Sequence, residues 1–388
     1  MRALVVTDSF KGCLDSCGVE RAVKSALLGA GFAGEDVVCL PASDGGEGFC
    51  RIATEAAGGT FVSVPCLDPL GRPVNASYGL SSDGSSAYIE SASVIGLDLV
   101  EPSLRNPLLL SSFGLGQMIR DAVIRGVKDI YIGLGGTTTC DGGIGMMMAL
   151  GVRFAGAGEL REDSRIVLAD IKHIDTSELF LRDSRLHCMA DTRALYYGPE
   201  GAARMFGPQK GLPENRTDEV DAWMERMAGL ICSCTGTNLG FVKGGGAAGG
   251  TGGALVAFCG AEMLSGAQGV LQIIGFDAEI RKATLLGKPF DLIVTGEGQL
   301  DIQTHTGKLP WEVLCRTRAL DREIPSFRPK VICVTGRLCK WRFGGFDAII
   351  PTTPPEGFGP DGRPLEIYLE PETAAANITD AVRKYISG

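Results

Sequence analysis

The sequence predicts an α/β protein of two domains, one inserted into the other. Its 388 residues exceed the roughly 250–300 residues at which single hydrophobic cores stop growing. Strand-like and helix-like segments alternate at both ends of the chain, which is typical of a parallel sheet, and the middle lacks this alternation. We therefore expect a Rossmann-like parallel-sheet domain over residues 1–66 and 287–388. A mixed α/β domain is expected over residues 67–286, with a cleft between the two.

The first part of the chain alternates between short apolar strands and amphipathic helices. Residues 1–7, 37–40 and 61–64 are compact β-prone runs, separated by helical patterns over 19–28 and 52–56. This β-α-β-α-β order predicts a single parallel sheet. Loops that follow its strands would lie at the carboxyl edge, where open α/β sheets bind their ligands.

The pattern changes after the Pro- and Gly-rich segment 68–73, which we interpret as a crossing between domains. Short strands at about 74–78 and 86–89 favour a hairpin or a mixed sheet. The other elements expected in this region are strands over 129–134 and 186–190 and helices over 115–125, 144–150 and 220–231.

The last hundred residues return to alternating strands and helices. Residues 291–294 predict a buried strand, and Gly296 and Gly298 predict a turn directly after it, because glycine tolerates positive φ. The remaining expected elements are helices over 311–318 and 373–386 and strands over 330–334 and 347–350.

Composition excludes several classes of function. A net charge of -9 without a basic stripe argues against nucleic-acid binding. The 13 cysteines include no CxxC pair and the three histidines are isolated, so we expect reduced thiols and no zinc site. No apolar run approaches the ~20 residues of a membrane span, and a strand beginning at Arg2 leaves no room for a leader peptide. We expect a cytoplasmic monomer or homodimer.

Acidic residues and glycines occur together in five loops of the chain. Carboxylate oxygens hold Mg²⁺ and lysine ammonium groups neutralise phosphate, so this composition suits a metal-bound polyphosphate. Solvated turns, or a capping role for residues 8 and 9, would account for part of the same pattern. The acids are Asp8, Asp44 with Glu47, Asp141, Asp191, and Glu297 with Asp301, and the lysines are Lys11, Lys210 and Lys308.

The segment 135–143, GGTTTCDGG, joins a predicted strand to a helix. Its backbone N–H groups and hydroxyls would form an anion cradle at the helix N-terminus. The chain has no GxxxxGK[ST] motif, no protein-kinase loops and no GxSxG. GxGxxG occurs at residues 244–249, but without a clear preceding strand it does not indicate a dinucleotide site. Together these features suit a small-molecule kinase without a Walker motif.

Taken in order, these blocks resemble the type I glycerate kinase family over nearly the whole chain. The resemblance implies transfer of the ATP γ-phosphate to D-glycerate with Mg²⁺, giving 2-phosphoglycerate in preference to 3-phosphoglycerate. It also agrees with one α/β domain inserted into another. The matching blocks are DSFKG (8–12), DGGEG (44–48), DPLGR (68–72), RNP (105–107), GG (135–136), DGG (141–143), GPQKG (207–211), GAAGG (246–250) and TGEG (295–298), followed by Asp301, Gln303, Thr304, Gly307 and Lys308.

On this basis we assign hypothetical roles to individual residues. Asp191 is expected to be the base that accepts the substrate hydroxyl proton, and Arg105 to pair with the glycerate carboxylate. Glu297 and Asp301 are expected to hold Mg²⁺. Lys11, Asp44 and Lys308 complete the expected catalytic group, Asp8, Ser9, Glu47 and Asn106 the glycerate site, and Gly135, Gly136, Thr137, Asp141, Lys210, Gly296 and Gln303 the nucleotide and phosphate site.

The chain departs from the family pattern at three places. Thr137–Cys140 replaces a Ser-Ala-Thr-Asn run, Ala194–Tyr196 replaces Asn-Pro-Leu, and Gln299 stands where arginine is common. Because the acids and lysines remain, we expect activity to survive. A non-catalytic sensor of glycerate or nucleotide is an alternative that the departures favour. An NAD(P)-dependent hydroxy-acid dehydrogenase would need a glycine fingerprint after the first strand, where the chain has residues 8–12 instead.

Overall fold

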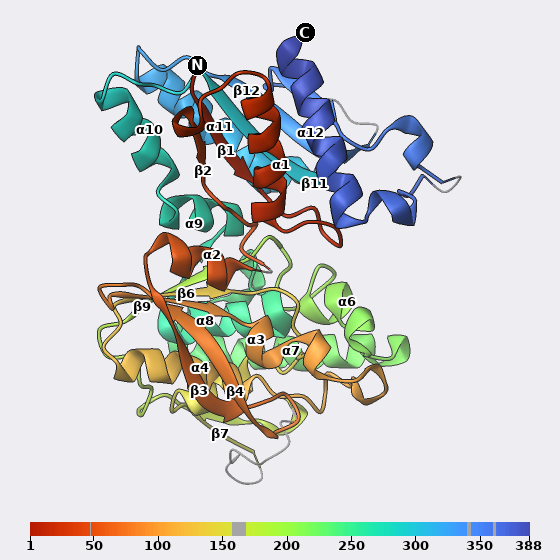
Figure 1. Ribbon diagram of the computed structural model, residues 1–388. Coiled ribbons are helices and arrows are strands. Elements are labelled where there is room, and N and C mark those ends of the chain that lie inside the picture. The colour runs from red at the N-terminus through yellow and green to blue at the C-terminus, as the bar shows by residue number, and fades with distance from the viewer. Residues whose placement is uncertain (47, 157–167, 340–342, 360–361) are drawn as a thin grey trace. The chain divides into compact units, whose positions relative to one another are not determined.

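The computed structural model describes residues 1–46, 48–156, 168–339, 343–359 and 362–388 (Figure 1). The chain forms two compact units, of which the first combines Met1–Asp44 with Ala267–Gly388 and the second comprises Gly45–Gly266. The α/β class and the discontinuous first unit agree with the sequence analysis. The expected boundaries at 66/67 and 286/287 instead fall inside the second and the first unit, respectively.

A five-stranded parallel sheet forms the centre of the first unit, in the order β13-β12-β11-β1-β2. The chain moves one way along the sheet from β1 to β2 and the opposite way from β11 through β12 to β13. β1 and β11 therefore meet at the switch point, where open α/β sheets place their ligands. The strands are β1 (Ala3–Thr7), β2 (Val37–Cys39), β11 (Leu292–Leu300), β12 (Lys330–Leu338) and β13 (Ala348–Pro351).

Helices cover both faces of this sheet, and all five residues of β1 are buried as a result. α1 (Ser16–Gly29) packs against α12 (Pro371–Ser387) on one face. α11 (Leu309–Glu323) contacts β1, β11 and β12. Crossovers between parallel strands are right-handed, and the chain moves in opposite directions along the two halves of the sheet. α11 therefore lies on the face opposite α1. Asp15 caps the N-terminus of α1, since its Oδ1 accepts from the Gly18 N–H at 2.8 Å. The remaining helices of this unit are α9 (Gly266–Ile273) and α10 (Phe276–Leu285).

The predicted turn at Gly296 and Gly298 is wrong, because β11 continues to Leu300. Neither glycine has a positive φ. A Cβ at Gly296 would lie 2.3 Å from the carbonyl oxygen of Val334 in β12, and a Cβ at Gly298 would lie 3.2 Å from the Cα of Phe10. These glycines are required by the close approach of neighbouring backbones and not by a bend.

The second unit contains a six-stranded mixed sheet in the order β10-β9-β6-β5-β4-β3. β3, β4 and β5 are antiparallel neighbours, whereas β5, β6, β9 and β10 run parallel. The prediction of a mixed sheet in the middle of the chain is confirmed. The strands are β3 (Thr60–Leu67), β4 (Pro73–Leu80), β5 (Ser86–Glu90), β6 (Asp129–Gly133), β9 (Arg185–Met189) and β10 (Glu262–Leu264).

Two predictions about the region around β3 are wrong. The strand predicted at residues 61–64 does not join the parallel sheet but pairs with β4 along its whole length. The segment 68–73, predicted to cross between domains, is the turn of this hairpin. Asp68 Oδ1 accepts from the N–H groups of Leu70 and Arg72, both at 2.9 Å, and its Oδ2 binds Arg72 Nε at 2.6 Å. This side-chain bonding stabilises a local turn, which sets the partner of β3.

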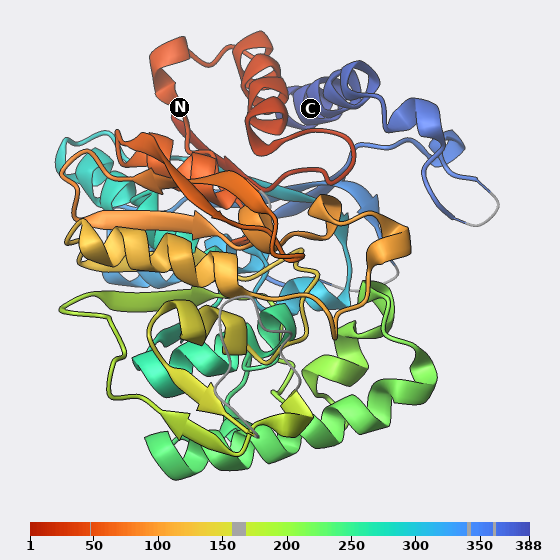
Figure 2. The same cartoon turned by 90° about the horizontal axis from the view of Figure 1, so that it is seen from below.

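One face of the six-stranded sheet builds the core of the second unit, with Ile89, Ile130 and Leu186 packed among buried helix residues. The helix α7 (Thr217–Thr235) lies beside the short strand β8 (His173–Asp175), which pairs with β7 (Arg153–Ala155) (Figure 2). None of the helices in the described ranges combines the length and the apolar character that a membrane crossing needs. The helices and short strands are α2 (Phe49–Ala56), α3 (Ala92–Ile95), α4 (Phe113–Ile124), α5 (Ile144–Ala149), α6 (Ala202–Phe206), α7 (Thr217–Thr235), α8 (Thr251–Cys259), β7 (Arg153–Ala155) and β8 (His173–Asp175).

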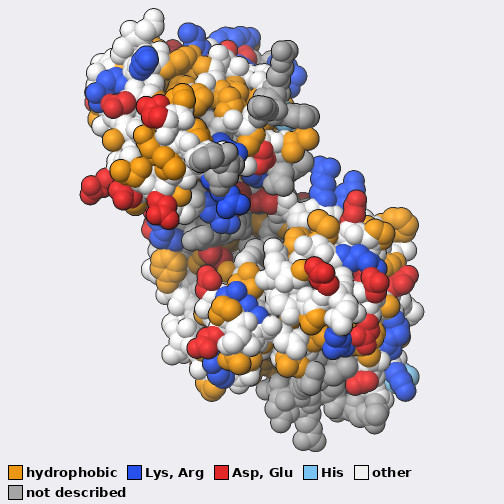
Figure 3. All heavy atoms as spheres, turned by 90° about the vertical axis from the view of Figure 1, so that its right-hand side faces the viewer, with side chains coloured by type: hydrophobic (Ala, Val, Ile, Leu, Met, Phe, Trp, Pro, Cys, Tyr) orange, Lys and Arg blue, Asp and Glu red, His pale blue; other side chains and the backbone are white. Residues whose placement is uncertain are grey.

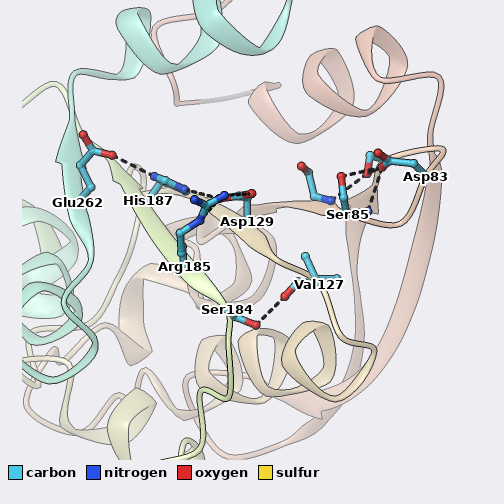
Figure 4. A network of polar contacts seen from close by, with 10 residues as sticks. Asp83, Ser85, Val127, Asp129, Ser184, Arg185, His187 and Glu262 are labelled. Carbon is cyan, nitrogen blue, oxygen red and sulfur yellow. Dashed lines mark hydrogen bonds and ion pairs between the residues drawn. The ribbon is translucent and has the colours of Figure 1, made fainter.

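The opposite face of the six-stranded sheet carries a polar ladder across β6, β9 and β10 (Figure 4). His187 lies between two carboxylates, with Nε2 at 3.0 Å from Asp129 Oδ1 and Nδ1 at 3.2 Å from Glu262 Oε2. Arg185 Nη2 binds Asp129 Oδ2 at 2.7 Å, and the Tyr131 ring stacks on His187 with centroids 4.6 Å apart. Such cross-strand pairs fix the register of neighbouring strands.

Candidate functional site

A pocket of about 370 Å³ lies at the carboxyl edge of the five-stranded sheet. Residues of β11 and β12 line it, together with residues from the segments that follow β1, β2 and β13, which places it across the switch point between β1 and β11. Its volume falls within the range of small-molecule sites, roughly 300–1,000 Å³. The polar residues at the strand ends are Asp8 and Ser9 after β1, Asp44 after β2, Glu297 in β11, Arg337 in β12 and Thr352 after β13.

Asp8 is the buried acid at the centre of this edge. Its N–H donates to the Gly296 carbonyl at 2.9 Å, and its Oδ1 accepts from the Ser9 N–H at 2.7 Å. Burial and the neighbouring carboxylate of Asp44 hold the pKa of Asp8 well above its ordinary value, and Glu297 raises it further. The Ser9 N–H and Lys308 oppose this rise. The pocket therefore crowds negative charge, which a bound cation would relieve.

Glu297 is 5% exposed and binds two partners. Its Oε1 accepts from Thr304 Oγ1 at 2.6 Å, and its Oε2 accepts from Lys308 Nζ at 3.2 Å. Burial raises the pKa of Glu297, and Lys308 and Thr304 oppose that rise. Burial alone would lower the pKa of Lys308, but Glu297, with Asp301 and Asp44, raises it overall. Lys308 is thereby held as a cation on the wall of the pocket.

Arg337 brings a cation that the sequence analysis did not predict. Its Nη1 donates to Gln299 Oε1 at 3.4 Å, and Gln299 Nε2 donates to Asp301 Oδ2 at 2.9 Å. A sequence signal for it exists, because Val334-Thr335-Gly336 before Arg337 in β12 repeats Val294-Thr295-Gly296 before Glu297 in β11. Two neighbouring strands thus end in the same pattern, one with an acid and one with a base.

The acids of the pocket fit a metal ion that arrives with a polyphosphate. In the ranges that the structure describes, no three His, Cys, Asp or Glu side chains gather so as to hold a metal by themselves. Mg²⁺ at phosphate sites usually needs only one or two carboxylates, with phosphate oxygens and water completing its shell. Glu297 and Asp301 both line the pocket. Each oxygen of Glu297 has one hydrogen bond, which leaves lone pairs for a cation.

Three predicted phosphate-site residues meet inside the second unit. Buried Lys210 donates from Nζ to Thr137 Oγ1 at 3.1 Å and to the Thr139 carbonyl at 2.8 Å, and burial lowers its pKa to about 8. Buried Asp141 accepts from the Ser112 N–H and hydroxyl, both at 2.8 Å, and from the Gly143 and Gly145 N–H groups. These bonds stabilise the loop after β6. Phosphate binding at Gly135, Gly136, Thr137, Asp141 and Lys210 stays a prediction.

The remaining predicted residues are distributed over both units. Lys11 lines the pocket of the first unit. In the second unit, Arg105 Nε donates to the Val100 carbonyl at 3.0 Å, Asn106 Oδ1 accepts from the Leu108 N–H, and Asp191 is exposed after β9. The binding of substrate by these three stays a prediction. Glu47 lies outside the described residues, and so does the side chain of Gln303.

Comparison with known proteins places the chain among named kinases. Residues 3–352 match the model of the "Glycerate kinase family". The chain is 36% identical to the glycerate 2-kinase of Escherichia coli (strain K12) over 319 residues, 80% of each protein. It is 34% identical to the glycerate kinase of Bacillus subtilis (strain 168) over 330 residues, 83% of each.

A solved structure extends the likeness to the whole fold. The crystal structure of a protein from Salmonella typhimurium LT2, provisionally named glycerate kinase 2, superimposes with a TM-score of 0.81 at 34% identity. The match covers 100% of this chain and 97% of the other. With the family model spanning most of the sequence and the same fold throughout, the chain belongs to the glycerate kinase family.

Proposed function

We propose that the protein transfers the γ-phosphate of ATP to D-glycerate, giving 2-phosphoglycerate and ADP. The observation that carries this proposal is the pocket at the switch point, which combines four carboxylates with three cationic side chains. Phosphoryl transfer needs positioning and charge neutralisation more than covalent chemistry, and this pocket offers both. The name of the Escherichia coli relative supports the 2-position. The residues are Asp8, Asp44, Glu297 and Asp301, with Lys11, Lys308 and Arg337.

On the donor side, the charged residues of the first unit receive the triphosphate. Lys308, held in place by Glu297, neutralises phosphate charge together with Lys11 and Arg337. Glu297 and Asp301, which both line the pocket, would hold Mg²⁺. The ion would supply positive charge that offsets the negative charge developing during transfer. Thr304 fixes the Glu297 carboxylate through its 2.6 Å hydrogen bond, so this ligand is positioned before the donor arrives.

On the acceptor side, Arg105 pairs with the glycerate carboxylate, and Asp191 accepts the proton of the attacking hydroxyl. Asp8 is the second candidate for the base. Burial raises the pKa of Asp8, which makes it a stronger proton acceptor than an ordinary carboxylate. Asp8 and Asp44 otherwise orient the hydroxyl groups of glycerate from the ends of β1 and β2.

The activity is tested by incubating the protein with D-glycerate and Mg-ATP and treating the product with enolase. We expect enolase alone to convert the product, because it acts on 2-phosphoglycerate directly. A product that reacts only after phosphoglycerate mutase is added would move the transfer to the 3-position. A protein that binds D-glycerate in calorimetry but consumes no ATP would be a sensor and would contradict the proposal.

Replacing Glu297 by Gln should lower kcat/KM by about 10²–10³-fold, the size of the loss when one preorganised electrostatic group is removed. The neutral amide keeps the shape of the side chain but weakens Mg²⁺ binding, so the Mg²⁺ concentration for half-maximal rate should rise. Steady-state kinetics over a Mg²⁺ series measures both effects. Glu323→Gln is the matched control, because Glu323 pairs with Arg281 at the exposed surface of the same unit. Equal Mg²⁺ dependence in the two variants would remove Glu297 from the metal site.

Replacing Asp191 by Asn should lower kcat by about 10²–10⁴-fold, the contribution of a general base. KM for ATP should change little, since the donor binds to the first unit. Asp183→Asn serves as control, because Asp183 is an exposed acid of the same unit that faces Lys128 at 3.6 Å. Near-normal turnover of Asp191→Asn, together with a large loss in Asp8→Asn, would transfer the role of base to Asp8.

Replacing Asp8 by Asn should stabilise the protein increasingly as the pH rises. The pKa of Asp8 is raised on folding, so the folded state holds this proton more tightly than the unfolded state. Its contribution to stability is therefore lost as the pH rises from the ordinary value of 3.8 through the raised value. Asn cannot ionise and escapes this loss. Thermal unfolding between pH 4 and 8 should show a Tm difference of several degrees that grows with pH.

The control for this measurement is Asp380→Asn, an exposed acid on α12. Its Tm difference from the wild type should stay flat over the same pH range. A flat difference for Asp8→Asn as well would show that the carboxyl of residue 8 is not destabilised by its surroundings.

A further inference from the structure

The pocket of the first unit has a second wall that carries no charge. It is formed by the C-terminal segment, after the last strand of the sheet. Half-buried Tyr368 ends the short helix Glu366–Tyr368, Leu369 follows it, and Ala374 and Asn377 lie in the first half of α12. The pocket therefore offers a ligand an apolar, partly aromatic surface in addition to the charged strand ends.

This wall lies beyond the residues that the family model matches. The family model ends at residue 352, before any of these residues. Hydrophobic side chains gather over the same part of the first unit (Figure 3), and the segment exposes Leu365, Ile367 and Leu369 by 44%, 57% and 38%. The family model therefore does not include the C-terminal wall.

Asn377 is the polar group of this wall on α12. Its side chain is half-buried and lines the pocket, and it forms no hydrogen bond with any residue in the described ranges. A side-chain amide presents an acceptor and a donor side by side. A ligand with an adjacent donor and acceptor would form two hydrogen bonds with the Asn377 amide. The N6 amino group and N7 of adenine are such a donor and acceptor.

We propose that the C-terminal wall is the base subsite of the nucleotide donor, with the purine packed against Tyr368 and Leu369 and read by Asn377. This inference rests on the proposed function, in which Lys308, Lys11 and Arg337 receive the triphosphate. A nucleotide is charged at one end and flat, apolar and hydrogen-bonding at the other. The pocket shows the same division between the strand ends and the C-terminal segment. Aromatic and apolar walls bind bases through their faces, and an amide adds selectivity at the edge.

Inosine triphosphate tests the role of Asn377, because it carries a carbonyl oxygen where adenine has the 6-amino group. The wild type should prefer ATP to inosine triphosphate by about tenfold in kcat/KM, the typical discrimination of one bidentate amide contact. In Asn377→Ala this ratio should fall towards one, with KM for D-glycerate unchanged. The control Asp380→Ala, also on α12, should keep the wild-type ratio.

Tyr368→Ala separates packing of the base from binding of the phosphates. It should raise KM for ATP and for inosine triphosphate alike and leave kcat near the wild-type value. Tripolyphosphate has no base, so its inhibition constant should be the same in Tyr368→Ala and the wild type. An equal loss for tripolyphosphate would show general damage to the pocket and would overturn the proposed subsite.

The same variants distinguish failure of the inference from failure of the proposed function. If the wild type transfers phosphate from ATP but Asn377→Ala keeps the wild-type ratio, the base subsite is wrong and the kinase stands. If the wild type transfers no phosphate, the kinase proposal fails. The affinities for ATP and inosine triphosphate, measured by calorimetry, then test the base subsite. We expect the wild type to bind ATP more tightly and Asn377→Ala to bind both nucleotides equally. An unchanged affinity ratio in Asn377→Ala would overturn the base subsite.

Discussion

The ion pair between buried Glu297 and half-buried Lys308 is the interaction on which the pocket of the first unit depends. Glu297 lies in β11 beside β1, so its carboxylate faces the same pocket as that of Asp8. Burial raises the pKa of both Asp8 and Glu297. Neighbouring carboxylates raise each further, Asp44 and Glu297 that of Asp8, and Asp301 that of Glu297. Lys308 opposes both shifts. Without this ammonium group, the edge of the sheet would be destabilised by its own charge.

Close backbone packing is what brings these groups together. β11 lies between β1 and β12, and Gly296 and Gly298 leave room for the neighbouring chains where a Cβ would collide with them. The turn after β11 then returns Thr304 and Lys308 to Glu297. The strand thus supplies the acid, and the segment after it supplies the hydroxyl and the ammonium that orient that acid. This arrangement would suit the proposed Mg²⁺ ligand, because a carboxylate whose orientation is fixed in advance binds a cation without further ordering.

The parts of the fold that follow from local pattern could be predicted from sequence. Alternating strands and helices at both ends gave the parallel sheet, and acids placed after strands gave Asp8, Asp44 and Glu297 at one edge. The failures concern partners that sequence does not show. β3 reads as another parallel strand, yet Asp68 ties it into a hairpin with β4. Gly296 predicts a turn, but a glycine is required there because Val334 of the neighbouring strand leaves no room for a Cβ. Tyr368 and Asn377 carry no motif, so only the folded chain brings them to the pocket.

Gln299 links charged groups of the pocket through a neutral side chain. An arginine at this position in β11 would add a cation beside the acids, and glutamine cannot. Arg337 lies opposite it in the register of β12, and Gln299 accepts a hydrogen bond from that guanidinium while donating to Asp301. The neutral amide therefore connects a cation on β12 to the acid that directly follows β11. Because β11 and β12 are paired and parallel, a cation on β12 lies within reach of polar groups on β11. The balance of charge in the pocket therefore depends on several strands together and not on any single motif.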